Sequence, residues 1–474
     1  MTAAHKWARL AHPRRHLSSR RGPSLSPSRP VSKRSATVLL VTSTVTTVGL
    51  WTLVAAGRDD IPRLDEKIPT GLAVEHGPDE EEVTRLLERG SFRHTGRQGS
   101  GILHYDGAQV NSNSPCEDRY THGLFSSPWN NAECWYTWGV FDGHSGWQTA
   151  ELLKQQLTPV VRQHLGRVKM EGVDGTPRVN DIQRAIMDGF IQLDNLIFDT
   201  AREARDSQNP LQDTIKCLAP AFAGSCALLS LFDAKTRMLH VACTGDSRAV
   251  LGRRIADSKW EAVALSADQN GRNQDEMTRI QREHPGEDAI ARDGRMLGLA
   301  VSRAFGDSRW KLPLDMQREY QRRFYGPSPL TPRYDIRTPP YLTAEPVVTS
   351  ITIEHDRPSF LIMASDGMWD TLSNEQAVEL VGKWIDARDG RAAVQAPQNY
   401  GKFDFGQFWK GVSWRFIPAR TTVRDDNAAV HLVRNALGGN HSELLHGRLA
   451  FDAPLSRKVR DDITVQVVFF SRDS

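Results

Sequence analysis

The feature that most constrains this chain is an apolar segment that ends abruptly in aspartate and glycine. Residues 134–141 (CWYTWGVF) have the aromatic and β-branched composition that is typical of a buried strand. Asp142 and Gly143 follow at once, and glycine lets the backbone turn sharply and exposes its carbonyl. A carboxylate and a bare carbonyl at a strand end are ligands suited to Mg²⁺ or Mn²⁺. His144 then places a titratable group beside such an ion.

The same pattern recurs further along the chain. An apolar run at 360–364 leads into Asp366, which is again followed by glycine. Asp462 directly precedes the apolar run 463–470, and Asp246 lies at a tight turn between two strand-like runs. The repetition indicates that acidic residues from distant parts of the chain meet at one site.

Asp-Gly pairs also have an ordinary explanation, because they are common in turns and turns follow strands. We interpret the more polar Asp106-Gly107, Asp293-Gly294 and Asp389-Gly390 pairs in this way. Two apolar strands that both end in Asp-Gly, with Asp462 opening a third, are harder to explain as turns alone.

Charge and cysteine usage exclude several classes of protein. The net charge is +3, but residues 1–35 hold nine Lys or Arg and no acid, so the remainder is slightly acidic. A body without a long basic stripe argues against nucleic acid as the main partner. The five cysteines include no Cys-x-x-Cys pair, so a zinc site is not expected. None is followed six residues later by arginine, the spacing of thiolate phosphatases.

The N-terminal region divides into three segments. Residues 1–35, rich in Arg, Ser and Pro, have the composition of a mitochondrial presequence. Residues 36–56 carry no charge and match one membrane-spanning helix, or a removable sorting segment. An anchored chain would place its body in the intermembrane space, and a fully imported chain in the matrix. Residues 57–90 read as a polar linker that ends in a short helix.

The body, residues 91–474, is expected to be α+β. Helices are predicted at 148–165, from 180 to about 197, at 373–387 and at 424–437, and paired strands at 221–232 and 238–252. Strands and helices occur in clusters rather than in strict alternation, which favours α+β over a doubly wound sheet. Residues 311–340 and 388–420 lack a clear period and are predicted to be surface insertions.

The acidic residues suggest a reaction. Asp142 could bridge two ions, with Asp366 and Asp462 completing one ion and the Gly143 carbonyl and Glu117 serving the other. Two such ions make a bridging water acidic enough to attack a phosphate ester as hydroxide.

His144 is the expected general acid for the leaving alkoxide in that reaction. The alternative is a structural histidine that is bonded to a carboxylate. Glu117 and Asp118 could likewise form only a solvated turn.

Six segments in this order resemble the metal-dependent type 2C protein phosphatases, over residues from about 91 to the C-terminus. They are CEDR (116–119), VFDGHSG (140–146), TGDSR (244–248), LAVSRAFGD (299–307), ASDGMWD (364–370) and RDDIT (460–464). The resemblance implies a central antiparallel β-sandwich flanked by helices, with two Mg²⁺ or Mn²⁺ ions at one end and a weaker third ion in some members.

The resemblance also implies a role for each acidic position. One ion would be held by Asp142, Asp366 and Asp462, and the second by Asp142, the Gly143 carbonyl and Glu117. Asp118 would bond a metal-bound water, and Asp246 and Asp370 match the positions that hold the third ion.

Asn113 departs from the pattern of many members, which carry a phosphate-gripping arginine four residues before the glutamate. Asparagine at this position resembles the pyruvate dehydrogenase phosphatase branch, and in particular its fungal mitochondrial members. Asn113 is the phosphate-contact candidate by position, but an amide lacks the bidentate grip of arginine, so another group must supply it.

The sequence therefore predicts a mitochondrial Ser/Thr protein phosphatase, in the matrix or at the inner membrane, that acts on the pyruvate dehydrogenase α subunit. The same chemistry on other mitochondrial phosphoproteins is the first alternative. An inactive phosphoprotein-binding module is the second, and it is disfavoured because every expected acidic position is filled.

Overall fold

The computed structural model describes residues 76–471, apart from residues 131, 172–175, 257–258, 288, 392–399 and 411–413. The predicted presequence (1–35) and apolar segment (36–56) lie outside the described residues, as does most of the predicted linker. Within the described part of the chain, no helix is both long and apolar enough to cross a bilayer. The described residues from Gly77 onward form one compact unit.

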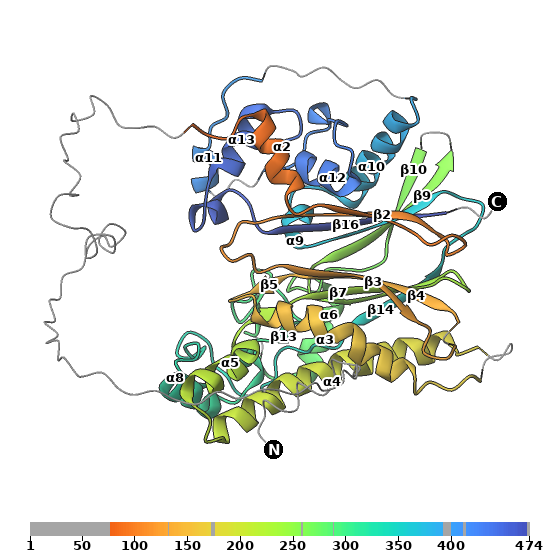
Figure 1. Ribbon diagram of the computed structural model, residues 1–474. Helices are drawn as coiled ribbons and strands as arrows, with labels where there is room; N and C mark the ends of the chain where they lie inside the picture. The colour runs from red at the N-terminus through yellow and green to blue at the C-terminus, as the bar shows by residue number, and fades with distance from the viewer. Residues whose placement is uncertain are drawn as a thin grey trace, which may run out of the picture. The chain divides into compact units, whose positions relative to one another are not determined.

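Two antiparallel β-sheets are stacked face to face at the centre of this unit (Figure 1). The six-stranded sheet has the order β1-β2-β16-β15-β9-β10, and the five-stranded sheet has the order β14-β8-β7-β4-β3. The strands of the first sheet are β1 (Phe92–Thr95), β2 (Ile102–Val110), β16 (Ile463–Phe470), β15 (Ser359–Ala364), β9 (Arg248–Ala256) and β10 (Lys259–Ala264). Those of the second are β14 (Val347–Thr352), β8 (Met238–Thr244), β7 (Ala227–Asp233), β4 (Cys134–Phe141) and β3 (Arg119–Ser126).

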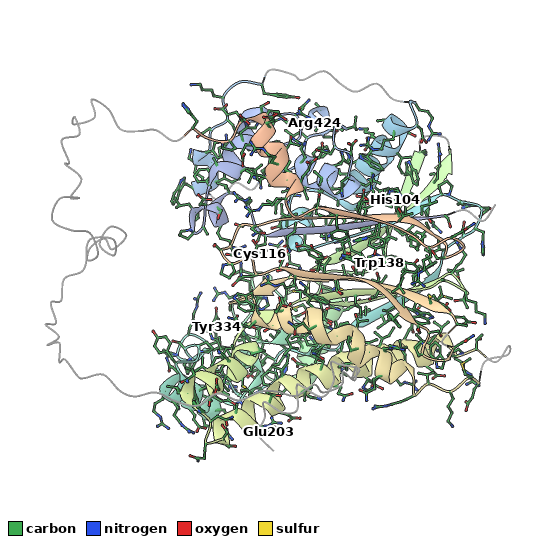
Figure 2. All side chains as sticks on the ribbon, in the orientation of Figure 1. His104, Cys116, Trp138, Glu203, Tyr334 and Arg424 are labelled. Carbon is green, nitrogen blue, oxygen red and sulfur yellow. The ribbon has the colours of Figure 1, made fainter. Side chains whose placement is uncertain are left out.

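Apolar side chains from both sheets fill the space between them. Trp138 of β4 and Leu361 of β15 are fully buried there, together with Val241 and Val468. Figure 2 shows Trp138 between the two layers. Strands β15 and β16 are buried along their whole length, because helices cover the other face of the sheet. This explains why their sequences are continuous apolar runs rather than alternating ones.

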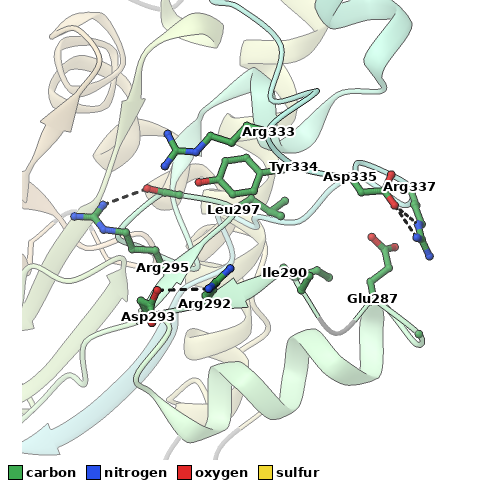
Figure 3. A pocket seen from close by; sticks show the side chains of 13 residues that line it. Glu287, Ile290, Arg292, Asp293, Arg295, Leu297, Arg333, Tyr334, Asp335 and Arg337 are labelled. Carbon is green, nitrogen blue, oxygen red and sulfur yellow. Dashed lines mark hydrogen bonds and ion pairs between the residues drawn. The ribbon is translucent and has the colours of Figure 1, made fainter.

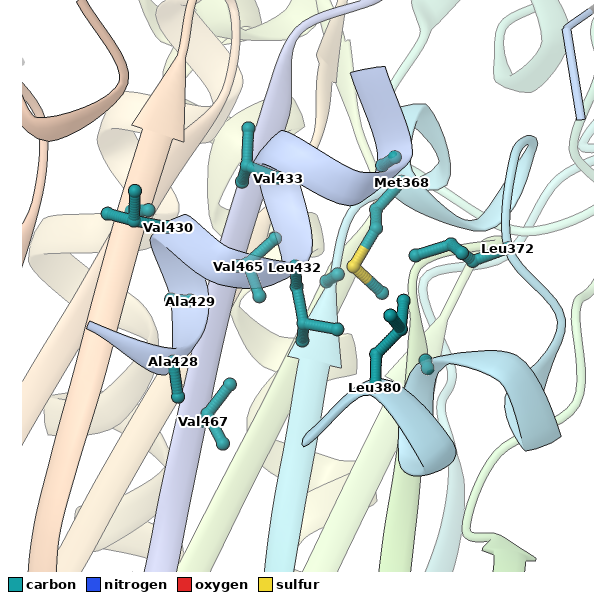
Figure 4. Close-up of a cluster of buried hydrophobic side chains, with 14 of the residues drawn as sticks. Met368, Leu372, Leu380, Ala428, Ala429, Val430, Leu432, Val433, Val465 and Val467 are labelled. Atoms are coloured by element: carbon teal, nitrogen blue, oxygen red, sulfur yellow. The ribbon is translucent and has the colours of Figure 1, made fainter. Parts of the chain in front are cut away.

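Helices cover the outer face of each sheet (Figure 1). In Figure 4, Leu432 and Val433 of α12 pack with Val465 of β16 and Leu380 of α10. The helices on the six-stranded side are α2 (Glu80–Glu88), α10 (Asn374–Arg388), α12 (Ala428–Leu437) and α13 (Ser442–Ala450). Those on the other side are α3 (Gln148–Leu165), α4 (Val179–Asp206), α5 (Leu211–Phe222) and α8 (Leu314–Phe324). The predicted α+β class with a helix-flanked antiparallel sandwich is confirmed.

Shorter elements connect these layers. The remaining strands are β5 (Gly143–His144), β6 (Gly224–Ser225), β11 (Ala291–Arg292), β12 (Arg295–Met296) and β13 (Phe305–Gly306). The remaining helices are α6 (Gln274–Glu283), α7 (Ser308–Lys311), α9 (Asp366–Trp369) and α11 (Gly406–Trp409), with 3-10 turns η2 (Pro418–Arg420) and η3 (Leu455–Lys458).

The helices predicted from apolar spacing are present, although α4 extends to Asp206 and α12 begins only at Ala428. Side-chain caps begin α10 and α12, whereas α3 and α4 begin without one. The Ser373 side chain accepts the N–H of Gln376, whose side chain in turn accepts the N–H of Ser373, so α10 begins with a capping box. Asn427 caps α12 through the N–H groups of Ala429 and Val430.

Two local predictions were wrong. Asp106-Gly107 is not a turn: Asp106 lies within β2, fully buried, and accepts hydrogen bonds from Arg93 and from the Ala428 N–H. The strand predicted at 221–232 starts too early, because residues 221–222 still belong to α5. The strand predicted at 238–252 forms two strands, β8 and β9, which belong to different sheets. The insertion at 311–340 stays a prediction; this segment contains α8, whose Tyr320 and Phe324 are buried.

Helix α2 packs into the folded unit, so the predicted linker of residues 57–90 overlaps that unit at its C-terminal end. Val83 and Leu87 are fully buried against the six-stranded sheet. Arg434 of α12 is also fully buried; its Nε lies 2.8 Å from Asp425 Oδ1 and its Nη2 donates to Thr84 Oγ1 at 3.1 Å. This buried cation ties α2 to α12.

We expect Arg434→Met to lower the free energy of unfolding by about 3–5 kcal/mol, because it leaves the Asp425 carboxylate buried without its cation. Arg424→Met is the matched control: Arg424 pairs with Glu80 near the surface, and its loss should cost less than about 1 kcal/mol. Urea unfolding followed by tryptophan fluorescence measures both variants. Similar small losses in the two would contradict the role given to Arg434.

Candidate metal centre and its histidine

Three aspartates from separate segments meet where strands of both sheets end. Asp142 follows β4, Asp246 lies between β8 and β9, and Asp366 opens α9 directly after β15. One carboxylate oxygen from each residue lies within 4.8 Å of the others. All three side chains are partly exposed, so a cation can reach them from solvent. The donor set consists of hard oxygen ligands, which suit Mg²⁺ or Mn²⁺.

Crowding of these carboxylates changes their acidity. Burial and the nearby Asp366 carboxylate raise the pKa of Asp246 to about 7. Burial raises the pKa of Asp366 to about 6, with a further contribution from Asp370. The pKa of Asp142 is raised well above its usual value by burial and by Asp366. A divalent cation would offset this repulsion, so the residues present fit a metal ion.

Gly143 brings the loop that carries Glu117 against the end of β4. A Cβ atom on Gly143 would stand 2.4 Å from the Glu117 carbonyl oxygen, so a larger residue would push the two segments apart. The Glu117 side chain is partly buried and accepts a hydrogen bond from the backbone of Gly146. Glu117 and Gly143 are therefore adjacent, as is required if both are to coordinate the same ion.

Asp118 connects the loop before β3 to the segment that carries Asp366. Its Oδ2 accepts hydrogen bonds from the hydroxyl groups of Ser365 at 2.8 Å and Thr464 at 2.7 Å. Burial, followed by the charge of Asp462, raises the pKa of Asp118 to about 7. Asp118 thus lies among the acidic side chains and is itself held in place by hydroxyl donors.

Asp462 organises the loop before β3. Its Oδ1 accepts the N–H groups of Ser112 at 2.5 Å and Asn113 at 2.9 Å. Its Oδ2 accepts the Glu117 N–H and the Asn113 side-chain amide, both at 2.9 Å. Asp462 is only 3% exposed, and its four hydrogen bonds fix the backbone of the loop that carries Glu117.

The predicted ligands therefore divide into two groups. Asp142 and Asp366 lie together with Asp246, whereas Asp462 is hydrogen-bonded to the Glu117 loop. Direct coordination of a metal ion by Asp462 stays a prediction. Asp370 lies at the C-terminal end of α9 and is exposed overall, but partial desolvation of its carboxyl group and the charge of Asp246 raise its pKa. This proximity is compatible with the predicted third ion.

His144 is paired with a carboxylate to which the sequence analysis gave no role. Its Nε2 lies 2.6 Å from Oδ2 of Asp307. The His144 side chain is 25% exposed, whereas that of Asp307 is 1% exposed. Burial lowers the pKa of His144, but the carboxylates of Asp307, Asp246 and Glu117 together raise it more, so the net pKa is above the usual value. Asp307 therefore favours the protonated imidazolium at the edge of the acidic group.

A small sheet with the order β13-β6-β5 brings this pair together. His144 and Gly306 both pair with Gly224 across the central strand. A Cβ atom on Gly224 would lie 2.2 Å from His144 Nε2 and 2.4 Å from Asp307 Oδ2, so the pair requires glycine there. Asp194 of α4 accepts the Gly306 N–H at 2.9 Å and holds the strand that leads into Asp307.

Asp307 is the last residue of the segment 299–307, which is one of the six segments that resemble the family. This membership was the signal in the sequence that could have identified Asp307 as a site residue. Its partner is 163 residues away in sequence, so neither periodicity nor local spacing could pair the two. Asp268 was also missed: it receives the Arg248 guanidinium at 2.9 and 2.6 Å and adds negative charge beside Asp246.

A separate cavity of about 840 Å³ lies between the segments 286–298 and 333–337 (Figure 3). In Figure 3, Arg292 contacts Asp293, and Arg337 contacts Asp335. Among the described residues, the lining of this cavity includes none of the predicted site residues, so the candidate centre lies outside it.

The raised pKa values predict that the metal-free protein loses stability as the pH rises. Between the usual carboxyl pKa of about 4 and the values of about 6 to 7 found here, the folded state binds more protons than the unfolded state. The free energy of unfolding must then fall with rising pH.

Thermal unfolding without metal should therefore give a lower Tm at about pH 8 than at about pH 5. Mn²⁺ should restore the Tm at the higher pH, because it binds the folded state. Asp366→Asn, which removes one charge, should show a smaller pH-dependent loss than the wild type. A wild type whose Tm ignores both pH and Mn²⁺ would contradict the proposed crowding of charge.

Comparison with known proteins identifies the family of this chain. The protein phosphatase 2C family model matches residues 106–400. A protein phosphatase 2C homolog of Schizosaccharomyces pombe is 41% identical over 374 residues, which cover 78% of this chain and 81% of that protein.

Two further relatives carry a more specific name, the mitochondrial [pyruvate dehydrogenase [acetyl-transferring]]-phosphatase 1. The Saccharomyces cerevisiae protein is 37% identical, with 80% of this chain and 70% of that protein covered. The Homo sapiens protein is 31% identical, with 79% of each chain covered. The chain therefore belongs to the protein phosphatase 2C family and is a serine/threonine protein phosphatase.

Proposed function

We propose that this phosphatase acts in mitochondria and removes phosphate from the α subunit of pyruvate dehydrogenase. The observation that carries the chemistry is the group formed by Asp142, Asp246 and Asp366, with the His144–Asp307 pair beside it. The choice of substrate and compartment is supported by the names of the relatives from yeast and human.

Mg²⁺ or Mn²⁺ would be held by Asp142 and Asp366, with the Gly143 carbonyl and Glu117 close by. When bound, such ions supply an activated water and offset the charge of the phosphate. The chain's own part is to hold these oxygens in place, and Asp118 and Asp462 do so through their hydrogen bonds to Ser365 and to the Glu117 loop.

His144 would donate the proton that the leaving serine or threonine alkoxide needs. The Asp307 carboxylate, 2.6 Å from Nε2, favours the imidazolium form and holds that ring nitrogen, while the His144 side chain stays partly exposed. A protonated histidine beside a recessed acidic group is the arrangement that general acid catalysis requires. The structural alternative, a histidine that is only bonded to a carboxylate, shares this contact. It predicts that replacing His144 would leave turnover unchanged in a folded protein.

Two alternatives remain distinct from this proposal. The same chemistry could serve other mitochondrial phosphoproteins, and a body held in the intermembrane space by residues 36–56 could not meet a matrix complex. Protease protection of mitoplasts separates the two compartments. An inactive binding module is disfavoured, since Glu117, Asp142, Asp366 and Asp462 are all retained.

We expect the purified protein to release phosphate from a phosphoserine peptide only when Mn²⁺ or Mg²⁺ is present. Asp142→Asn removes a charge from the centre of the acidic group and should reduce turnover by at least about 100-fold, more than the loss that follows from changing an outer-shell partner. Asp293→Asn, which changes an exposed aspartate in the β11–β12 turn, is the control and should retain full activity.

Activity that persists in Asp142→Asn would reject the proposed chemistry. Substrate choice is measured with phosphorylated pyruvate dehydrogenase beside unrelated phosphoproteins at equal concentration. Equal rates on all of them would reject the specific substrate while leaving the phosphatase reaction intact.

A further inference from the structure

Asn113, the phosphate-contact candidate by position, has its amide turned toward carboxylates. Its Nδ2 donates to Asp462 Oδ2 at 2.9 Å and lies 3.5 Å from Glu117 Oε2. An amide nitrogen has two hydrogens, and both are directed at these acceptors. Asn113 thus orients the acidic loop, and the phosphate of a substrate needs a donor from elsewhere in the chain.

Two arginines near the centre are already committed to structure. Arg119 donates its Nε to Glu151 at 2.6 Å and its Nη1 to the carbonyl oxygens of Cys116 and Asp118. Arg248 donates from Nε and Nη2 to Asp268 and from Nη1 to Asn374. Moving either guanidinium would leave a carboxylate without its partner.

Arg457 is placed differently. It lies on η3, its side chain is 43% exposed, and its Nη1 pairs with Asp461, four residues later. The Cβ of Asp461 is 3.1 Å from the position that a Cβ on Gly367 would take, and Gly367 directly follows Asp366. The partner of Arg457 therefore lies beside the segment that carries Asp366, and this partly exposed ion pair can exchange with another partner.

The turn that carries Arg457 is anchored to the acidic loop. Ser456 is fully buried, and its hydroxyl donates to the Ser112 carbonyl at 2.5 Å. Ser112 in turn donates its N–H to Asp462 and its hydroxyl to the Arg460 carbonyl at 2.9 Å. Only the side chain of Arg457 is then left to move, because its backbone is fixed relative to the centre.

The charge of Arg457 affects two carboxyl groups of the acidic centre, those of Glu117 and Asp366. Burial raises the pKa of Glu117 and of Asp366, and Arg457 opposes that rise at both carboxyls. These residues are the predicted ligands of different ions, and Arg457 is near enough to interact electrostatically with both carboxyl groups. The exposed Arg415, by comparison, acts on Asp370 at the position of the third ion.

We propose that Arg457 contacts the substrate phosphate and takes the place of the missing arginine at position 113. Its planar fork can hold two phosphate oxygens, in exchange for its surface pair with Asp461. This inference rests on the proposed function, because it names the residue that binds the phosphate group in that same site.

The test compares inhibition by inorganic phosphate across matched variants. Arg457→Ala should raise the Ki of inorganic phosphate, and the KM of a phosphoserine peptide, about tenfold or more. Arg457→Lys keeps the charge without the fork and should give an intermediate Ki. Lys458→Ala removes a charge from the neighbouring exposed position and should stay within about twofold of the wild type.

The Mn²⁺ concentration for half-maximal activity is measured in parallel and should change far less than the phosphate Ki in Arg457→Ala, because solvent screens this exposed charge. An altered Mn²⁺ requirement with an unchanged phosphate Ki would overturn the inference and make Arg457 a support for the metal ligands. An unchanged Ki in an active Arg457→Ala would overturn it as well. Arg457→Gln provides the same comparison if the alanine variant does not fold, and an inactive wild type would reject the proposed function itself.

Discussion

The structure depends on holding like charges together. Asp142, Asp246 and Asp366 are kept within 4.8 Å although each carboxylate disfavours the ionisation of the others. Strands β4, β8 and β15 make this possible, because their buried apolar side chains hold the strand ends in place against the repulsion. A site of this kind is less stable when empty than when a cation is bound, which is the expected trade between stability and function.

Hydrogen bonds around this group convert the strand ends into one unit. Asp118 joins the loop before β3 to Ser365, and Asp462 fixes the backbone that presents Glu117. On the other side, β5, β6 and β13 place His144 against Asp307. The acidic group and the histidine therefore sit on one rigid edge of the sandwich, where loops would otherwise move independently.

The parts that could be predicted from sequence are those with a local signature. Apolar runs that end in Asp-Gly predicted the strand ends at Asp142 and Asp366, and spacing predicted helices such as α3. Asp106 was missed, because its burial depends on an arginine that faces it from β1. The pairing of Asp307 with His144 depends on a small sheet built from three distant dipeptides, which carry no period. Long-range pairing therefore set the limit of what could be predicted.

The central claim is that these carboxylates gather two divalent cations. The most direct measurement is a crystal soaked in Mn²⁺ with diffraction collected at the manganese absorption edge. We expect two anomalous peaks about 4 Å apart, one between Asp142 and Asp366 and the other between Asp142 and Glu117. A map without peaks at these side chains, from protein that is active in the same buffer, would contradict the claim.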